Sequence, residues 1–233
     1  MIKLKDILSE GLYDQGIFKA VFTAGGPGSG KSHAASSLFG MPEKMPHVSS
    51  NGLKGVNSDQ AFETYMKKAE IPLDLEKLTT GQQSIAMDLR SKAKSVTFKR
   101  MNTFINSKLG MLIDGTGKNY DKISKMKGKL AAKGYDCFMI YVNTDLSVAL
   151  ERNAARERTV PENLVKKAWQ EVSNNLGKFQ GLFGANNILV VDNSEYKEFE
   201  NIIKKNAREF VRRPIQNHVA KQWIKKEQEL RRR

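Results

Sequence analysis

Cysteine, histidine and repeated segments are scarce in this chain. Its 233 residues include one cysteine, Cys137, so an internal disulfide and a cysteine-rich zinc site are excluded. The histidines His33, His47 and His218 lack the spacing of metal ligands, and no Ser-His-Asp arrangement can be argued from the sequence. No internal repeat and no low-complexity linker interrupts the chain. These absences exclude a disulfide scaffold, a cysteine-based zinc domain and a repeat array.

Long hydrophobic runs are missing as well. The longest apolar runs have the length of strands, far short of a membrane span. The first residues, MIKLKDILSEGL, lack the continuous apolar core of a signal peptide, so we expect a cytoplasmic protein with no membrane partner. Hydrophobic residues make up 39% of the chain, which is enough to bury a sizeable core and excludes global disorder.

Acidic residues are outnumbered, and the imbalance is concentrated at one end. Lysine and arginine total 39 against 25 aspartates and glutamates, a net charge of +14. Residues 204–233 hold eleven of the basic residues and three glutamates, which is +8. Ile215, Val219 and Trp223 recur every fourth residue there, as in an amphipathic helix. The tail is expected either to contact a polyanion, nucleic acid first of all, or to be a solvated terminal helix.

One glycine-rich stretch carries most of the functional information. It fills the pattern G-x-x-x-x-G-K-[ST] between a strand-like run at 18–24 and a helix-like run at 33–39, the context that a phosphate-binding loop requires. The glycines let successive N–H groups point at phosphate oxygens, Lys31 can reach the β- and γ-phosphates, and the Ser32 hydroxyl can coordinate Mg²⁺. The predicted nucleotide-binding residues are Gly25, Gly26, Pro27, Gly28, Ser29, Gly30, Lys31 and Ser32. The sequence therefore predicts a nucleoside triphosphate as ligand.

Strand-like and helix-like segments alternate along the chain, which predicts a parallel α/β sheet covered on both faces. The long segment at 82–107 has apolar residues at helical spacing, and its basic residues, Arg90 among them, are expected to be solvated. The predicted strands are 18–24, 56–59, 110–114, 135–142 and 188–192. The predicted helices are 33–39, 60–69, 82–107, 121–133, 146–155, 161–176 and 195–210.

Two aspartates follow predicted strands, at the sheet edge where parallel sheets bind their ligands. Asp114 ends the strand-like run at 110–114 and can hold Mg²⁺, because this hard cation prefers oxygen ligands. Its alternative role is an N-cap or turn residue. Asp59 follows Val56 and can orient an acceptor hydroxyl and accept its proton. It can equally be the N-cap of the next helix.

An arginine-rich segment precedes the predicted helix break at Pro161. Arg152 and Arg156 are four residues apart and share a helix face, and Arg158 follows. Such arginines can clamp the charged oxygens of a transferring phosphoryl group. The alternative is an ordinary charged surface helix, balanced by Glu151.

Taken together, these segments resemble the P-loop kinases of the zeta-toxin and polynucleotide-kinase type over about residues 18–192. The matching pieces are FTAGGPGSGKS, VNSDQAF, LIDGTG and RNAARERTVP. The resemblance implies a five-stranded parallel sheet, ATP with Mg²⁺, and transfer of the γ-phosphate to a hydroxyl. It implies that Lys31 and Asp59 are catalytic, and that Arg152, Arg156 and Arg158 close over the phosphates. The expected domains are an N-terminal helical segment at 1–17, a P-loop kinase domain at 18–210 and a basic C-terminal extension at 211–233.

Two departures from this family affect the acceptor. The family carries an arginine three residues after the acceptor aspartate, where this chain has Phe62, and the polynucleotide kinases carry one soon after the phosphate loop, where it has Ser36. The acceptor therefore stays open between a nucleic acid end and a small nucleotide or sugar-type metabolite.

Two rival functions stay open beside the kinase. A GTPase would explain the D-x-x-G pattern at Asp114, but the guanine-reading N-K-x-D is absent, since 118–121 reads KNYD. A nucleic-acid-binding ATPase or switch protein would use the basic tail as its working surface. Transfer of labelled phosphate would separate the kinase from both.

Overall fold

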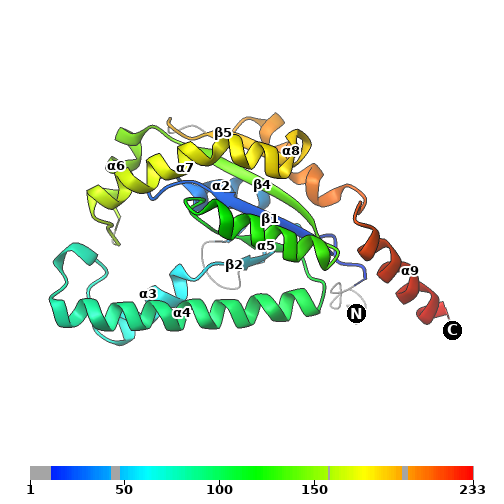
Figure 1. Cartoon of the computed structure of the whole chain (residues 1–233), viewed down its shortest axis with the longest axis horizontal. Helices are drawn as coiled ribbons and strands as arrows, with labels where there is room; N and C mark the ends of the chain where they lie inside the picture. The colour runs from blue at the N-terminus through cyan, green and yellow to red at the C-terminus, as the bar shows by residue number, and fades with distance from the viewer. Residues whose placement is uncertain (1–11, 43–47, 157, 196–198, 233) are drawn as a thin grey trace, which may run out of the picture.

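The fold is a single parallel sheet with helices on both faces (Figure 1). The computed structural model describes residues 12–42, 48–156, 158–195 and 199–232. Five strands lie in the order β2-β3-β1-β4-β5, and every neighbouring pair is parallel. Their bounds are β1 Lys19–Ala24, β2 Lys54–Val56, β3 Met111–Ile113, β4 Asp136–Asn143 and β5 Ile188–Asp192. The predicted five-stranded parallel α/β sheet is confirmed.

The central strand β1 shows why these segments form strands. All six of its residues are buried, because both faces of the sheet are covered and a nearly continuous apolar run is what such a strand needs. Side chains alternate across the sheet, so Val21 packs in one core and Phe22 in the other. In the second core Phe22 lies edge-on to Phe183.

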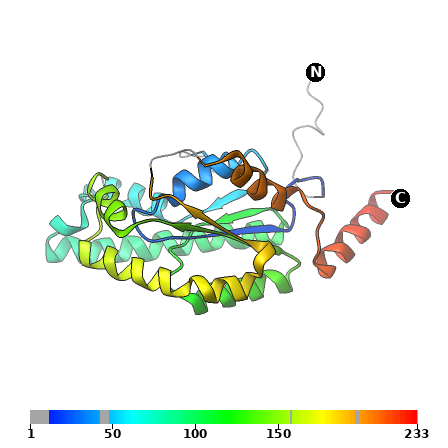
Figure 2. The same cartoon turned by 90° about the horizontal axis from the view of Figure 1, so that it is seen from above.

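The helices form two layers, one on each side of the sheet (Figure 2). Helices α2 and α8 contribute to the core that contains Val21, whereas α4, α5 and α7 contribute to the core that contains Phe22. The α-helices are α2 Lys31–Phe39, α3 Asp59–Lys68, α4 Thr80–Asn106, α5 Tyr120–Ala132, α6 Leu146–Ala154, α7 Glu162–Phe183, α8 Asn201–Arg212 and α9 His218–Arg232. Single 3₁₀ turns occur at Leu75–Lys77 and Ala185–Asn187. Within these described helices none is apolar over a length that would cross a bilayer.

The predicted and observed helix bounds differ most at α7 and α8. Helix α7 continues seven residues past its predicted end, because Phe179 and Phe183 extend its buried stripe and Gly177 borders open space rather than a turn. Helix α8 begins at Asn201 rather than at 195, since Ser194 donates to Asp192 and holds a bend after β5. Of the predicted helix at 1–17, residues 1–11 lie outside the described residues, and 12–18 form turns around the buried Asp14.

Helix α4 is held at its N-terminus by a capping box. The Thr79 hydroxyl accepts from the Gln82 backbone N–H at 3.3 Å, and the Gln82 side chain accepts from the Thr79 N–H at 3.0 Å. We expect Thr79→Ala to lower the free energy of unfolding by about 1 kcal/mol, because the Gln82 backbone N–H loses the hydroxyl that accepts from it. Thr103→Ala, an exposed site within the same helix, is the control and should change little. Urea unfolding of both variants measures this, and equal stability of the two would contradict the capping role.

Candidate functional site

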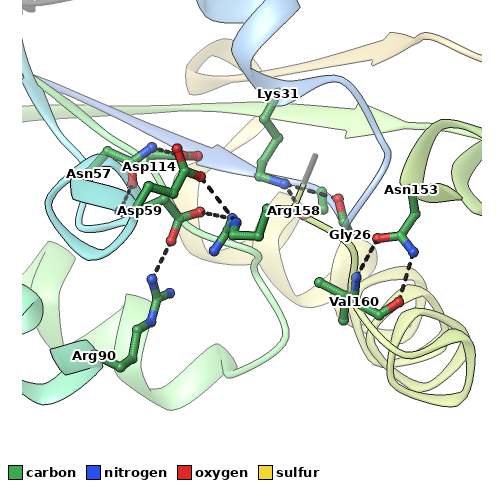
Figure 3. Close-up of polar contacts among 11 residues, drawn as sticks. Gly26, Lys31, Asn57, Asp59, Arg90, Asp114, Asn153, Arg158 and Val160 are labelled. Atoms are coloured by element: carbon green, nitrogen blue, oxygen red, sulfur yellow. Dashed lines mark hydrogen bonds and ion pairs between the residues drawn. The ribbon is translucent and has the colours of Figure 1, made fainter. Parts of the chain in front are cut away.

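A cavity of about 420 Å³ opens at the carboxyl ends of the central strands. It is lined from three directions: by the start of α2, by the ends of β2 and β3 with the start of α3, and by the segment between α6 and α7. Six of the predicted site residues line it, namely Lys31, Ser32, Asp59, Asp114, Arg156 and Arg158. Asn57 lines it too, and Figure 3 shows it beside Asp114 and Asp59.

The phosphate-binding loop is built as the sequence pattern requires. Gly28 and Gly30 have φ of 79° and 82°, and Gly30 is the N-cap of α2. A Cβ at Gly28 would overlap the Ala149 carbonyl, so only glycine lets the loop pass α6. The Ser29 carbonyl accepts from Thr144 Oγ1 at 3.0 Å and from Asn193 Nδ2 at 2.8 Å, which fastens the loop to the ends of β4 and β5.

Within this loop Lys31 turns back on the backbone. Its Nζ donates to the carbonyls of Gly25 at 2.8 Å and Gly26 at 2.9 Å. Burial lowers the pKa of Lys31, and the nearby Asp114 carboxylate opposes that shift. The buried Ser29 hydroxyl has no hydrogen-bond partner among the described residues. A loop with an unpaired buried hydroxyl and an inward lysine fits an anionic ligand.

Asp114 is held by side chains from two neighbouring strands. Its Oδ1 accepts from Thr23 Oγ1 and its Oδ2 from Asn57 Nδ2, both at 2.8 Å. The Asn57 side chain also accepts from the Asp59 backbone N–H at 2.7 Å. Asn57 therefore links Asp114 to the backbone of Asp59. No signal in the sequence indicated this role, because an asparagine in a loop is common.

Asp59 lies between two arginines rather than at a helix cap. Its Oδ1 is 2.6 Å from Arg90 Nη1, and its Oδ2 is 2.8 Å from Arg158 Nη2. The interpretation of Asp59 as an N-cap is wrong, because Ser58 is the N-cap of α3 and Asp59 is the first helical residue. The backbone N–H of Asp59 donates to the Asn57 side chain. Burial raises the pKa of Asp59, but Arg158 and Arg90 together lower it below its ordinary value.

Arg90 is the functional residue that the sequence analysis missed. It was expected to be solvated, yet its guanidinium pairs with Asp59 and lies 5.1 Å from the ring centroid of Phe62. Phe62 itself is buried in the α3–α4 core. An arginine from α4 thus reaches Asp59 and lies against the ring of Phe62. No local signal could have revealed this, since the two residues are 31 positions apart.

The three predicted lid arginines have different partners in the structure. Arg158 pairs with Asp59 and, at 3.1 Å, with Glu63 of the next turn of α3, and Arg156 lines the cavity. Arg152 instead donates to the Asn193 carbonyl at 2.7 Å and is not among the cavity-lining residues. Its contact lies next to the loop at 25–32, because the Asn193 side chain donates to the Ser29 carbonyl.

Further hydrogen bonds hold the segment between α6 and α7 in place. Asn153 exchanges two hydrogen bonds with the Val160 backbone, at 2.8 and 3.1 Å, which fixes the bend that carries Arg156 and Arg158 (Figure 3). Thr159 Oγ1 donates to Asp74 at 2.6 Å and joins the segment to the α3–α4 connection. Hydrogen bonds from Thr159 and Lys77 lower the pKa of Asp74 to about 2.

Removing Arg90 gives a direct test of this electrostatic arrangement. We expect Arg90→Gln to raise the pKa of Asp59, because one of the two cations that stabilise its carboxylate is lost. A carboxylate whose pKa is lower in the folded chain stabilises the fold above its unfolded pKa, and this stabilisation is lost as the pH falls through the acid range. The variant should therefore lose less stability on acidification. Carboxyl ¹³C titration by NMR measures the pKa of Asp59. Lys92→Gln, at an exposed site of the same helix, is the control. An unchanged pKa of Asp59 in Arg90→Gln would show that Arg158 alone lowers it.

Comparisons with known proteins agree with this architecture. A family model described as an AAA domain matches residues 21–178. A comparison with curated proteins finds no match to this chain. The fold is similar to a structure of the PezAT chromosomal toxin-antitoxin system of Streptococcus pneumoniae, at 13% identity, a TM-score of 0.53, and 83% of this chain on 84% of that one. It is also similar to the AvrRxo1-ORF1:AvrRxo1-ORF2 structure with sulphate ions, at 13% identity and a TM-score of 0.54. That match covers 76% of this chain but 55% of the other, so this chain spans about half of that protein's length.

Proposed function

Since the chain belongs to the AAA domain family, whose model matches most of it, we propose that it is an ATP- and Mg²⁺-dependent phosphotransferase acting on a hydroxyl. Within P-loop kinases we place it with the zeta-toxin and polynucleotide-kinase type. The observation that carries this proposal is the convergence of Lys31, Asp114, Asp59 and Arg158 on one cavity. These residues come from four separate segments, and phosphoryl transfer needs each of their charges at one place.

The phosphate-binding loop supports ATP as the donor. Backbone N–H groups of 25–32 and the N-terminus of α2 favour an anion, and Lys31 adds a cation beside them. When a triphosphate enters, Lys31 is in position to exchange the Gly25 and Gly26 carbonyls for phosphate oxygens. The unpaired Ser29 hydroxyl is a further donor within the loop.

Magnesium fits the oxygen donors of Ser32 and Asp114. Ser32 and Asp114 both line the cavity, and the part of the chain that the structure describes holds no cluster of three or more carboxylate, histidine or cysteine ligands. Mg²⁺ is commonly held by one or two protein oxygens together with phosphates and water, so this sparse set is suitable. The ion would neutralise charge on the β- and γ-phosphates.

Asp59 distinguishes transfer from hydrolysis in this proposal. The acceptor oxygen bonds to the γ-phosphorus, the bond from that phosphorus to the bridging oxygen breaks, ADP leaves, and the hydroxyl proton passes to the Asp59 carboxylate. With a pKa below its ordinary value, Asp59 is ionised at neutral pH, as the group that accepts the hydroxyl proton must be. Because Arg158 occupies Oδ2, we infer that the acceptor displaces Arg158, which then becomes free to contact the transferring phosphoryl group.

The acceptor belongs to the class of nucleic acid ends or small nucleotide or sugar-type metabolites. The cavity is lined by both apolar and polar side chains, which suits a ligand with an apolar part and several hydroxyls. Met41, Pro42 and Leu73 are apolar, whereas Gln60 and Glu63 can hydrogen-bond to hydroxyls. The alternative is a switch protein that hydrolyses ATP without an acceptor.

Transfer of labelled γ-phosphate from ATP across oligonucleotides, nucleosides and nucleotide sugars tests the proposal. We expect a labelled acceptor in one of these groups and ADP in equal amount. ATP binding with release of inorganic phosphate only, whatever the acceptor, would replace the kinase with the ATPase or switch protein.

A further inference from the structure

The C-terminal helix α9 docks one face on the domain and leaves the other exposed. Ala220 is fully buried, and Trp223 lies edge-on to Phe18 with ring centroids 5.4 Å apart. The carboxylate of Asp136 accepts from the backbone N–H groups of Gln216 and Asn217, at 2.9 and 3.0 Å, just before the helix begins. The apolar stripe that the sequence predicts for this helix therefore packs against the domain itself.

The exposed face of α9 is basic. Lys221, Lys225 and Arg232 are spaced by four and seven residues, which places them along one side of the helix, and Lys226 lies further around the same exposed surface, on the other side of the exposed Glu229. All four are exposed, and among the described residues none of them forms an ion pair. We call these four residues the basic arm. Even with Glu229 among them, these four cations leave the exposed surface of α9 positively charged and available to a partner.

The basic arm lies far from the phosphate-binding loop. Asp136 is the first residue of β4, and the loop is fastened beyond the last, Asn143. Seven steps along a strand correspond to about 23 Å. Figures 1 and 2 both show α9 extending from the end of the molecule opposite α6. A partner on the arm is therefore held apart from the cavity rather than inside it.

We propose that the basic arm is a binding surface for the phosphate backbone of nucleic acid, independent of the proposed phosphotransfer site. A group of exposed cations that form no ion pair among the described residues suits the dense negative charge of a nucleic acid backbone. A helix about 10–12 Å across also fits the major groove of B-form DNA. Anionic lipid fits less well, because Trp223 and Ile224 pack against the core and leave Leu230 as the exposed large apolar residue of α9.

Charge removal without deletion tests this surface. Truncating α9 would uncover Phe18, so the test variant is Lys221→Gln, Lys225→Gln, Lys226→Gln and Arg232→Gln combined. The matched control removes four exposed charges elsewhere: Lys94→Gln, Lys99→Gln and Arg100→Gln in α4 with Lys167→Gln in α7. Both variants of the full chain are titrated against a fluorescein-labelled DNA duplex over a series of salt concentrations.

We expect the arm variant to bind the duplex about tenfold or more weakly, and the slope of log affinity against log salt to flatten by up to about 3 to 4. The control variant should keep the wild-type slope, and both variants should keep phosphate transfer. Equal losses in both variants would show a general charge effect and overturn the proposal. Absence of duplex binding with capture by vesicles that contain phosphatidylserine would overturn it in favour of a membrane. Because binding is read without transfer, failure of the kinase proposal leaves this result unaffected.

Discussion

Asp59→Asn is expected to lower phosphate transfer by about 10²–10⁴-fold while ATP binding is kept. The substitution preserves the shape of the side chain but removes the negative charge and the ability to accept the hydroxyl proton. The pairs with Arg90 and Arg158 involve partly exposed groups, so their loss should cost the fold no more than about 1 kcal/mol. Single-turnover transfer with labelled ATP measures the rate, and nucleotide titration measures binding.

Glu63→Gln is the matched control for this substitution. Glu63 lies on the next turn of α3, lines the same cavity and pairs with the same Arg158, but it has no place in the proposed proton transfer. Its replacement should lower transfer by less than about tenfold, the effect of a partly exposed ion pair. If both variants lose transfer equally, positioning of Arg158 rather than proton acceptance by Asp59 explains the result. Unchanged transfer in Asp59→Asn would show that the acceptor assignment is wrong.

Lys31→Met is expected to lower transfer by about 10²–10³-fold and to weaken ATP binding as well. Methionine keeps an unbranched side chain of similar length but removes the cation that faces the phosphates. Wild-type protein saturated with ATP and Mg²⁺ should gain about 2.7 kcal/mol of stability at a hundred times the dissociation constant. Thermal unfolding with and without the nucleotide shows whether the variant loses this gain.

The stability of the variant without nucleotide separates binding from folding. The replacement takes the Nζ donor away from the Gly25 and Gly26 carbonyls, so we expect the unliganded fold to lose no more than about 1–3 kcal/mol. Lys167→Met, an exposed lysine of α7, is the control and should keep the full nucleotide-dependent gain. A full gain in Lys31→Met would contradict the role of Lys31 in holding the triphosphate.

Local sequence determined the donor half of the candidate site. The loop at 25–32 carries its own conformational signals in Gly28 and Gly30, and the flanking strand and helix are encoded by adjacent residues. The same holds for Asp114, which the apolar run of β3 delivers to the sheet edge. Such features depend on neighbours in the chain, and for that reason pattern and spacing were sufficient to predict the five-stranded parallel sheet and its order of elements.

The tertiary structure alone decided the surroundings of Asp59 and the fate of the basic residues. Arg90 reaches Asp59 across 31 positions and Arg158 across 99, and no spacing rule connects residues that meet only because α3, α4 and the α6–α7 segment pack together. The sequence likewise showed that the tail is basic and apolar every fourth residue. Only packing against Phe18 and Asp136 decided which face of α9 is buried, and therefore that the cations of the basic arm stay exposed, at the end of the sheet opposite the phosphate-binding loop.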